Sequence, residues 1–421
     1  MTLQLAPLKR FVDPSRPITY GIVQAGEHVP DGVPYIRPVD MTDHDGIPDP
    51  ERLLRTSRAI AAMYSRSEVR GGDLIVSIGP SFGKVMIVPY ELSGANLTQG
   101  SARVAPAAGI DARWLYWALQ SGLARSYWSA AVGGATFRAL NLGPLAATPL
   151  PVTDRDAQRS VAGFLDRETA RIDGVVDRKQ ALLAVLGERR RAMVDRATVP
   201  GLAAGSDRWP LHPLRKLAAG EGLFTDGDWI ETPYITDEGI RLIQTGNIGV
   251  GTYREQGFRH ISNETFRQLR CTEVLPGDVL ICRLAEPVGR ACMAPDLGCR
   301  MITSVDVCIL RPNSSVDRRF IVSYLSSSAH LSLLESIARG GTRDRVSRDQ
   351  LGQVMVPLPP LEEQQRIASH IDEELQLLST LGARLTEQIQ LLVQHRHTLI
   401  TAAVSGKLDI GGRRITPPRS S

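Results

Sequence analysis

Basic and amide side chains occur at corresponding places in the two halves of the chain. Arg37 corresponds to Gln244 and Lys84 to Arg290, and each half has a Gly-Gly stretch followed by hydroxyl and basic residues. Such side chains can bind guanine and adenine edges and phosphate oxygens. The DNA-binding candidates are Arg37, Lys84, Thr136, Arg138, Gln244, Asn247, Arg290, Thr342, Arg343 and Arg345. Because corresponding residues differ in type, we expect the halves to read different sequences, with an ordinary solvated surface as the alternative for each residue.

Sequence motifs for catalysis are scarce. The segment 79–84 resembles a phosphate-binding loop, but it is one residue short, and Val85 stands where a serine or threonine is required. The chain has neither the His-Glu-x-x-His pattern of zinc proteases nor the Gly-x-Ser-x-Gly pattern of serine hydrolases. We therefore expect no catalytic residues. An enzyme with an unrecognised site and a coiled-coil adaptor that binds only protein remain alternatives.

Composition sets broad limits on the protein. A chain of 421 residues with 43% hydrophobic and 22% charged residues is typical of a globular protein of two or more domains. The net charge of +4 permits binding to nucleic acid. The five cysteines lie in the second half without a Cys-x-x-Cys pair, which favours free thiols over disulfides or zinc and gives no metal ligands. The sequence shows no signal peptide and no membrane-length apolar run, so we expect a cytoplasmic protein that binds no membrane.

A repeat as long as half the chain organises these residues. At a shift of about 206, segment 7–9 matches segment 213–215, and Gly72-Asp73-Leu74-Ile75 matches Gly277-Asp278-Val279-Leu280. Many further pairs follow in the same order, which indicates a duplicated module rather than a short-period solenoid. Short apolar runs at 74–76 and 279–281 predict strands, and segments 111–121 and 317–327 predict helices.

Each module is followed by a long helical pattern that begins after a proline-rich segment. Apolar residues recur at seven-residue steps in both patterns, which is typical of a coiled-coil seam. The predicted seam is Leu165, Ile172, Leu186 and Met193 in the first helix and Ile371, Leu378, Leu385, Leu392 and Leu399 in the second. Lys179 also keeps the seven-residue step of the first helix, while Leu182 is expected to widen its apolar stripe and Leu381 to fill an alternate position of the second. Two amphipathic helices of about 40 residues, each about 60 Å long, cover their seams most simply by pairing with each other.

The expected fold class is therefore α+β, with two similar domains, each followed by a long helix. The helices are expected to pair as an antiparallel coiled coil with pseudo-two-fold symmetry. The predicted boundaries are 1–150 and 207–357 for the domains, 151–200 and 358–410 for the helices, 201–206 for a linker and 411–421 for a disordered tail.

Several motifs resemble those of the DNA-specificity subunit of type I restriction-modification systems. The resemblance rests on Pro-Leu-Pro-Pro-Leu-Glu-Glu-Gln-Gln-Arg-Ile-Ala at 357–368, Ala-Ala-Val-Ser-Gly-Lys-Leu at 402–408, and segment 164–173. Within the modules, Gln-Thr-Gly-Asn-Ile at 244–248 and Pro-Gly-Asp-Val-Leu at 276–280 look like target-recognition domain motifs. The first module departs from this pattern with Arg-Pro-Val-Asp at 37–40, and segment 153–158 lacks the usual Leu-Glu-Glu-Gln.

The resemblance implies a non-catalytic subunit of a complex that methylates and cleaves DNA. Each target-recognition domain would read one half of a split, asymmetric sequence in double-stranded DNA. The paired helices would set the spacing and dock two methyltransferase subunits, which restriction translocase-nuclease subunits would join. S-adenosylmethionine, ATP and magnesium would be bound by those partners, and this chain would bind no cofactor.

Overall fold

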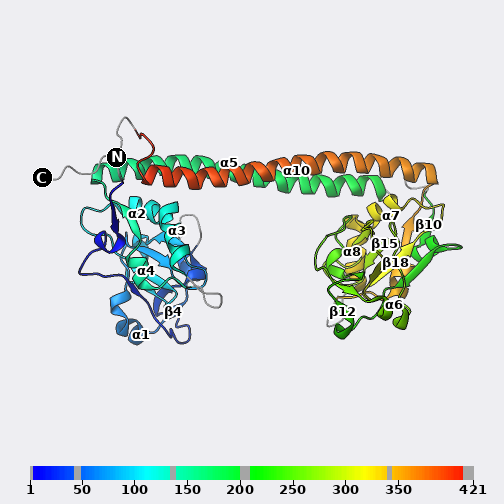
Figure 1. Ribbon diagram of the computed structural model, residues 1–421, viewed down its shortest axis with the longest axis horizontal. Coiled ribbons are helices and arrows are strands. Elements are labelled where there is room, and N and C mark those ends of the chain that lie inside the picture. Colours follow the sequence, from blue (N-terminus) through cyan, green and yellow to red (C-terminus); the bar gives the residue numbers. More distant parts are fainter. Residues whose placement is uncertain (1–2, 42–48, 133–138, 200–208, 339–343, 411–421) are drawn as a thin grey trace. The chain divides into compact units, whose positions relative to one another are not determined.

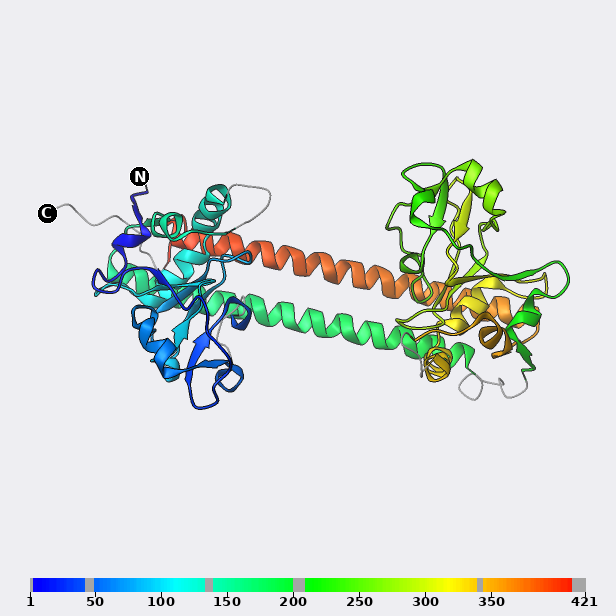
Figure 2. The same ribbon diagram turned by 90° about the horizontal axis from the view of Figure 1, so that it is seen from below.

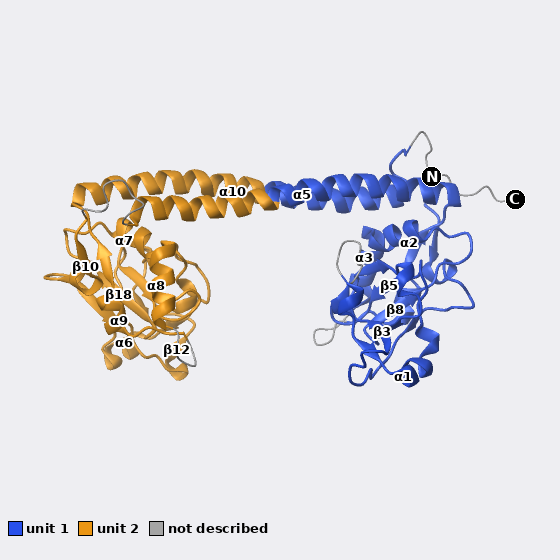
Figure 3. Ribbon diagram, turned by 180° about the vertical axis from the view of Figure 1, so that it is seen from behind, with its two compact units in different colours: residues 1–179, 387–421 blue, residues 180–386 orange. Residues whose placement is uncertain are grey.

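The computed structural model of the protein describes residues 3–41, 49–132, 139–199, 209–338 and 344–410. The chain forms two compact units, residues 1–179 with 387–421 and residues 180–386, coloured separately in Figure 3. Each unit contains one globular module and a part of each long helix. We call the globular part before the first long helix module 1 and that before the second module 2. The predicted linker 201–206 and tail 411–421 lie outside the described residues.

Module 1 is built on two small sheets. The larger sheet has the order β2-β8-β5-β6, from Thr19–Tyr20, Ser101–Val104, Leu74–Ser77 and Val85–Ile87. The smaller has the order β4-β3-β7, from Arg55–Thr56, Val33–Ile36 and Asn96–Leu97. Strands β1 (Leu5–Pro7) and β9 (Pro149–Pro151) pair at the point where the module joins its helix. The helices are α1 (Arg58–Met63), α2 (Ala112–Gln120), α3 (Gly122–Ala131) and α4 (Leu142–Ala146).

Module 2 repeats this plan. Its first sheet has the order β11-β18-β15-β16, from Leu223–Asp226, Val307–Arg311, Val279–Cys282 and Ala291–Met293. Its second has the order β12-β14-β13-β17, from Ile235–Thr236, His260–Ile261, Ile240–Ile243 and Met301–Thr303. Strands β10 (Leu211–Pro213) and β19 (Met355–Pro357) pair as β1 and β9 do. The helices are α6 (Asn263–Leu269), α7 (Arg318–Leu325), α8 (Ser328–Ala338) and α9 (Arg348–Gln353).

The predicted strands at 74–76 and 279–281 are the buried centres of the two larger sheets. They read as continuous apolar runs because each has a hydrophobic core on both faces. In β5, Leu74 and Val76 belong to the core formed with α2, whereas Ile75 belongs to the core under the smaller sheet. In β15, Leu280 likewise faces away from Ile281 into a separate core. The period-two alternation of a strand thus joins the two layers of each module.

The long helices α5 (Arg155–Thr198) and α10 (Leu361–Val404) have 44 residues each. Their segments lie side by side and antiparallel within each unit (Figures 1 and 2). In the first unit, Asp173 pairs with Arg396 at 2.9 Å, and the Nζ of Lys179 donates to Gln388 at 2.6 Å. In the second, Arg189 lies 4.0 Å from the carboxylate of Glu374. The α+β class and the antiparallel helix pair are therefore confirmed.

All nine predicted seam residues are buried or half-buried. Leu165 and Ile371 are fully buried, Ile172 and Leu378 nearly so, and the other five are half-buried. Two flanking predictions were wrong, because Leu381 is 40% exposed and Leu182 46% exposed. A pair of helices covers only a narrow stripe on each partner, so apolar residues beside that stripe remain in solvent.

Each module docks on its own long helix through one repeated contact. The main-chain N–H of Asp111, the residue before α2, donates to the Oε1 of Gln158 on α5 at 2.8 Å. In module 2, Asp317 before α7 donates to Gln364 on α10, also at 2.8 Å. Both glutamine side chains are almost completely buried. The two contacts are related by the 206-residue shift and fix each module at the start of its helix.

Candidate nucleic-acid interface

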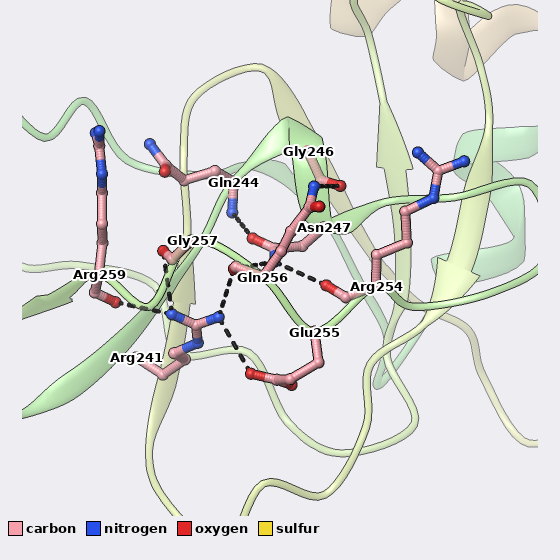
Figure 4. A network of polar contacts seen from close by, with 9 residues as sticks. All are labelled: Arg241, Gln244, Gly246, Asn247, Arg254, Glu255, Gln256, Gly257 and Arg259. Carbon is pink, nitrogen blue, oxygen red and sulfur yellow. Dashed lines mark hydrogen bonds and ion pairs between the residues drawn. The ribbon is translucent and has the colours of Figure 1, made fainter. Parts of the chain in front are cut away.

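The segment Arg254 to Arg259 of module 2 is held from beneath by a buried arginine (Figure 4). Arg241, on β13, is 2% exposed, and its guanidinium donates to the main-chain oxygen of Gln256 at 2.9 Å. It reaches the carbonyls of Gly257 and Arg259 at 3.4 Å and pairs with Glu255 at 3.3 Å. One buried side chain therefore binds the main-chain oxygens of three residues of this segment and the carboxylate of a fourth, Glu255.

Asn247 holds the same segment from its other side. Its Nδ2 donates to the carbonyls of Arg254 at 2.9 Å and Gln256 at 2.8 Å, while its Oδ1 accepts the Gln244 N–H at 2.9 Å. The Nε2 of Gln256 donates to the carbonyl of Gly246 at 2.6 Å. The prediction that Asn247 contacts DNA needs correction: the residue is 2% exposed and its amide is satisfied within the module, so it is a positioning residue.

The two arginine side chains at the ends of this segment point outward from that support. Figure 4 shows Arg254 and Arg259 extending away from the network. Both are exposed, and within the described part of the chain neither guanidinium has a hydrogen bond or an ion pair. Gly257 has a φ of 62°, in the left-handed region where glycine is unstrained. We call residues 254–259 the reading segment.

Free guanidinium groups on a fixed main chain suit DNA. Arginine can donate two hydrogen bonds to the O6 and N7 of guanine, and it can also neutralise a phosphate. Phe258, between the two outer arginines, is 67% exposed, and the Arg241 guanidinium lies 5.1 Å from its ring centroid. Gln244, a predicted DNA contact at the edge of this network, is half-buried, and its main chain is held by Asn247.

Module 1 has the same turn with different chemistry. The Arg37 N–H donates to Asp40 Oδ2 at 2.8 Å, as the Gln244 N–H donates to Asn247. Here, however, the guanidinium of Arg37 also binds Asp40, with Nη2 2.8 Å from Oδ1, and that hydrogen bond raises the pKa of Arg37. The predicted contact Arg37 is therefore half-exposed but already engaged by a carboxylate, whereas module 2 has uncharged amides at this turn.

Arg290 also departs from the prediction that it contacts DNA. It is 6% exposed, because its guanidinium lies inside module 2 and organises the loops around it. It donates at 2.7–3.0 Å to four main-chain oxygens, those of Thr245, Ile248, Leu284 and Pro287. A guanidinium with four carbonyl acceptors has little capacity left for a base or a phosphate.

Lys84, the corresponding residue in module 1, is half-buried, and its Nζ donates to the carbonyl of Met41 at 2.9 Å. The phosphate-loop-like segment 79–84 is the connection of the antiparallel β5–β6 hairpin. A phosphate loop instead joins a strand to a helix whose first N–H groups bind the anion. The segment therefore lacks the context of a nucleotide site.

The remaining candidates lie near the Gly-Gly stretches. Arg345 is exposed and pairs with Asp306 at 2.8 Å. Thr136, Arg138, Thr342 and Arg343 lie outside the described residues. The structure thus brings Gln244 and Asn247 together at the reading segment, and it places Arg290 behind the turn that carries them.

Comparison with known proteins shows which family the chain resembles. Residues 233–391 match the model of the type I restriction modification DNA specificity domain. The EcoBI specificity subunit of Escherichia coli is 26% identical over 191 residues, 45% of this chain and 40% of that protein. The EcoKI specificity subunit of Escherichia coli K12 is 24% identical over 190 residues, 44% of this chain and again 40% of the relative. These matches therefore span about two fifths of each curated relative.

The chain is therefore similar to type I restriction specificity subunits, and residues 233–391 carry the match to their DNA specificity domain. Two solved structures share its fold at 18% sequence identity. One, from work on complex assembly and conformational transition of a type I restriction-modification system, has a TM-score of 0.74 and covers 97% of this chain and 100% of its own. The HsdS subunit from Thermoanaerobacter tengcongensis has a TM-score of 0.52 and covers 96% of this chain and 97% of its own.

Sequence reasoning missed two exposed arginines of the candidate interface and the buried arginine that supports them. Arg241, Arg254 and Arg259 were not among the predicted contacts. A signal was available, because the reading segment is polar, contains a glycine and follows the Gln-Thr-Gly-Asn turn by only six residues. Arg241 supports the segment from beneath, but nothing in the sequence pattern indicated that this arginine is buried.

The part of the chain that the structure describes contains neither a metal-binding group nor a membrane-spanning helix. In those residues no group of three or more histidine, cysteine, aspartate or glutamate side chains could hold a metal ion. Across the same ranges, no helix combines the length and the apolar composition needed to cross a membrane.

Proposed function

We propose that this chain is the non-catalytic subunit that gives a type I restriction-modification complex its DNA sequence specificity. The reading segment carries this proposal. Arg241 and Asn247 fix its main chain, while Arg254 and Arg259 project into solvent without a protein partner among the described residues. Because the main chain is already fixed, only the two arginine side chains lose conformational entropy on binding, which favours readout of base edges.

The target we propose is split and asymmetric. Two modules with one fold support two half-sites, and their corresponding turns differ in charge. Module 1 has an Arg37–Asp40 ion pair where module 2 has Gln244, whose main chain is held by the buried Asn247. Side chains of different hydrogen-bonding type select different bases, so the two halves should not be copies of each other.

The long helices are the proposed scaffold for partners. Large apolar side chains are exposed on both helices away from the seam, namely Leu182, Val185, Leu377, Leu391 and Val393. Such side chains favour contact with another protein. We propose that two methyltransferase subunits dock there, that restriction translocase-nuclease subunits join them, and that S-adenosylmethionine, ATP and magnesium are bound by those partners in the cytoplasm.

Selection from a pool of random duplexes tests this function. The full-length chain is incubated with the pool, and bound DNA is recovered and sequenced. The proposal expects an enriched motif of two unlike short halves with a fixed spacer. A contiguous motif, or no enrichment, would overturn it. The enzyme alternative is tested separately, because it requires the purified chain alone to methylate or cleave DNA when cofactors are supplied.

A further inference from the structure

A cavity in module 1 gathers four arginines. It lies between the loop that enters β2, the turn after α1, and β8. Its lining includes Arg16, Arg66, Arg70 and Arg103, with the hydroxyl residues Ser15, Thr19 and Ser65. Its charges are not balanced within the cavity. Asp73 neutralises Arg16 through two hydrogen bonds of 2.7 and 2.6 Å, which leaves three arginines facing Glu68.

Arg103 forms the floor of this cavity. It is 4% exposed, and its guanidinium donates to the carbonyls of Arg66 at 2.6 Å, Glu68 at 2.9 Å and Pro17 at 3.2 Å. Its Nε–H is buried and has no hydrogen-bond partner within the described residues. Burial, together with the nearby charge of Arg16, lowers the pKa of Arg103. A buried cation with spare donors is stabilised by an anion.

Module 2 shows that the fold does not require this arginine. In module 1, Arg103 lies opposite both Thr19 and Ile75 in the sheet. In module 2 the corresponding position, opposite Thr225 and Leu280, is Ile309, which is fully buried in an apolar core. The charge at this position is therefore a property of module 1 alone.

The other two cations are accessible. Arg66 and Arg70 are exposed, and neither has an ion pair in the described part of the chain. The Arg66 guanidinium lies 5.8 Å from the ring centroid of Tyr20, which holds it over the same side of the module. Their counterparts in module 2, at a shift of 205, are Cys271 and Leu275.

We propose that this cavity binds one phosphate of the DNA backbone beside the half-site that module 1 reads. Arg66 and Arg70 would neutralise the phosphate, Arg103 would supply the fixed positive floor, and the hydroxyl of Ser65 would donate to a phosphate oxygen. The assignment rests on the proposed function. A phosphate contact sets the register of the module on the duplex without selecting bases, so it complements the turn at Arg37.

The test compares the full-length chain with its Arg66→Ala/Arg70→Ala variant on a random-sequence duplex. Both residues are exposed, so the variant should fold. Affinity is measured between about 50 and 200 mM salt, where each neutralised phosphate contributes about one to the slope of log K against log salt. We expect the slope of the variant to be shallower by about one. Arg10→Ala, an exposed arginine of the same module outside the cavity, is the matched control and should keep the wild-type slope.

A second measurement separates a bound phosphodiester from a free anion. Inorganic phosphate should raise the unfolding temperature of the wild-type chain relative to chloride at equal ionic strength, and the double variant should lose that increase. An unchanged DNA slope overturns the proposal, whether or not free phosphate binds. Failure of the proposed function looks different: the wild-type chain would then show no preference for any sequence, although its slope could still respond to Arg66 and Arg70.

Discussion

Asp195, near the end of α5, accepts a hydrogen bond at 2.7 Å from the main-chain N–H of Ser328, the first residue of α8. In the other unit, Thr401 of α10 accepts the N–H of Gly122, the first residue of α3, at 2.8 Å. The two contacts are related by the 206-residue shift with the helices exchanged. The first N–H groups of a helix have no partner in their own helix. Each module is therefore capped by the long helix that follows the other module in sequence.

Removing such a cap should loosen one unit. Asp195→Ala leaves the Ser328 N–H without its charged acceptor and should lower the free energy of unfolding of the second unit by about 1–2 kcal/mol. Thr401→Val should cost the first unit about 1 kcal/mol. Calorimetry of the full chain measures both. Glu188→Ala, an exposed change on the same helix as Asp195, should stay within about 0.5 kcal/mol of wild type. A loss as large as that of Asp195→Ala in this control would contradict the capping role.

A charge in the helix seam should separate the helices. Leu385 is half-buried in the seam, whereas Leu381, one turn earlier, is 40% exposed. Leu385→Asp should therefore cost about 2–4 kcal/mol through desolvation of the carboxylate and loss of packing, and it should impair partner docking. Leu381→Asp should cost less than about 1 kcal/mol. Equal unfolding temperatures for the two variants would show that the seam does not hold the helices together.

The duplication explains why much of this architecture was predictable. Asp111 with Gln158 and Asp317 with Gln364 are polar residues whose only sequence peculiarity is their common spacing, yet they make the same contact. The repeated spacing predicts a shared fold because both copies must provide hydrogen-bond partners for the same main-chain groups. It does not predict which side chains are buried. Arg290 was predicted to contact DNA because arginine is a common base reader, and nothing in the sequence indicated that four carbonyls surround it.

The width of the seam was unpredictable for a related reason. A seven-residue repeat gives the direction of the apolar stripe, but the depth to which a partner covers it depends on the partner. Leu381 and Leu182 satisfy the pattern and remain exposed. We propose that these two exposed side chains are part of the apolar surface on which partner subunits dock.

Arg254 should select bases in one half of the target only. Arg254→Ala removes an exposed guanidinium and leaves the Asn247 contact to its main-chain oxygen in place. We expect a loss of about 1–3 kcal/mol in discrimination at positions read by module 2, with no change in the other half. Competition between the selected duplex and single-base variants measures this loss. Arg267→Ala, an exposed change on α6 of the same module, should keep full discrimination.

Arg241 should act through the reading segment instead of touching DNA. Arg241→Lys keeps the charge but cannot reach the carbonyls of Gln256, Gly257 and Arg259 together. Faster amide hydrogen exchange across residues 254–259 should accompany weaker discrimination, while the salt dependence of binding stays as in the wild type. Weaker discrimination with unchanged exchange would instead assign Arg241 to direct contact.

Acid should destabilise module 2 through His330. This side chain is 1% exposed and packs on Tyr324 with ring centroids 5.6 Å apart, and burial lowers its pKa to about 4. An unfolded histidine titrates near 6.5. Between about pH 6.5 and 4 the unfolded chain binds a proton that the native chain does not. Lowering the pH through this range should therefore reduce the free energy of unfolding by about 3 kcal/mol through this residue.

The variant His330→Phe keeps an aromatic ring beside Tyr324 and removes the titration. Its free energy of unfolding should therefore fall less steeply between pH 7 and 4 than that of the wild type. Denaturant unfolding at a series of pH values measures the difference in free energy of unfolding between the two proteins. The contribution of the carboxylates is the same in both and cancels from this difference. Parallel profiles for the two proteins would show that His330 does not control the acid response.

Genome-wide mapping of DNA methylation at single-molecule resolution tests the central claim most directly. Cells with this chain, without it, and with Arg254→Ala are compared. We predict that a methylated motif of two unlike halves depends on the chain, and that the variant alters one half while the other half and the spacer persist. A motif that survives loss of the chain, or a variant that changes both halves together, would contradict the claim that two modules read two halves of one target.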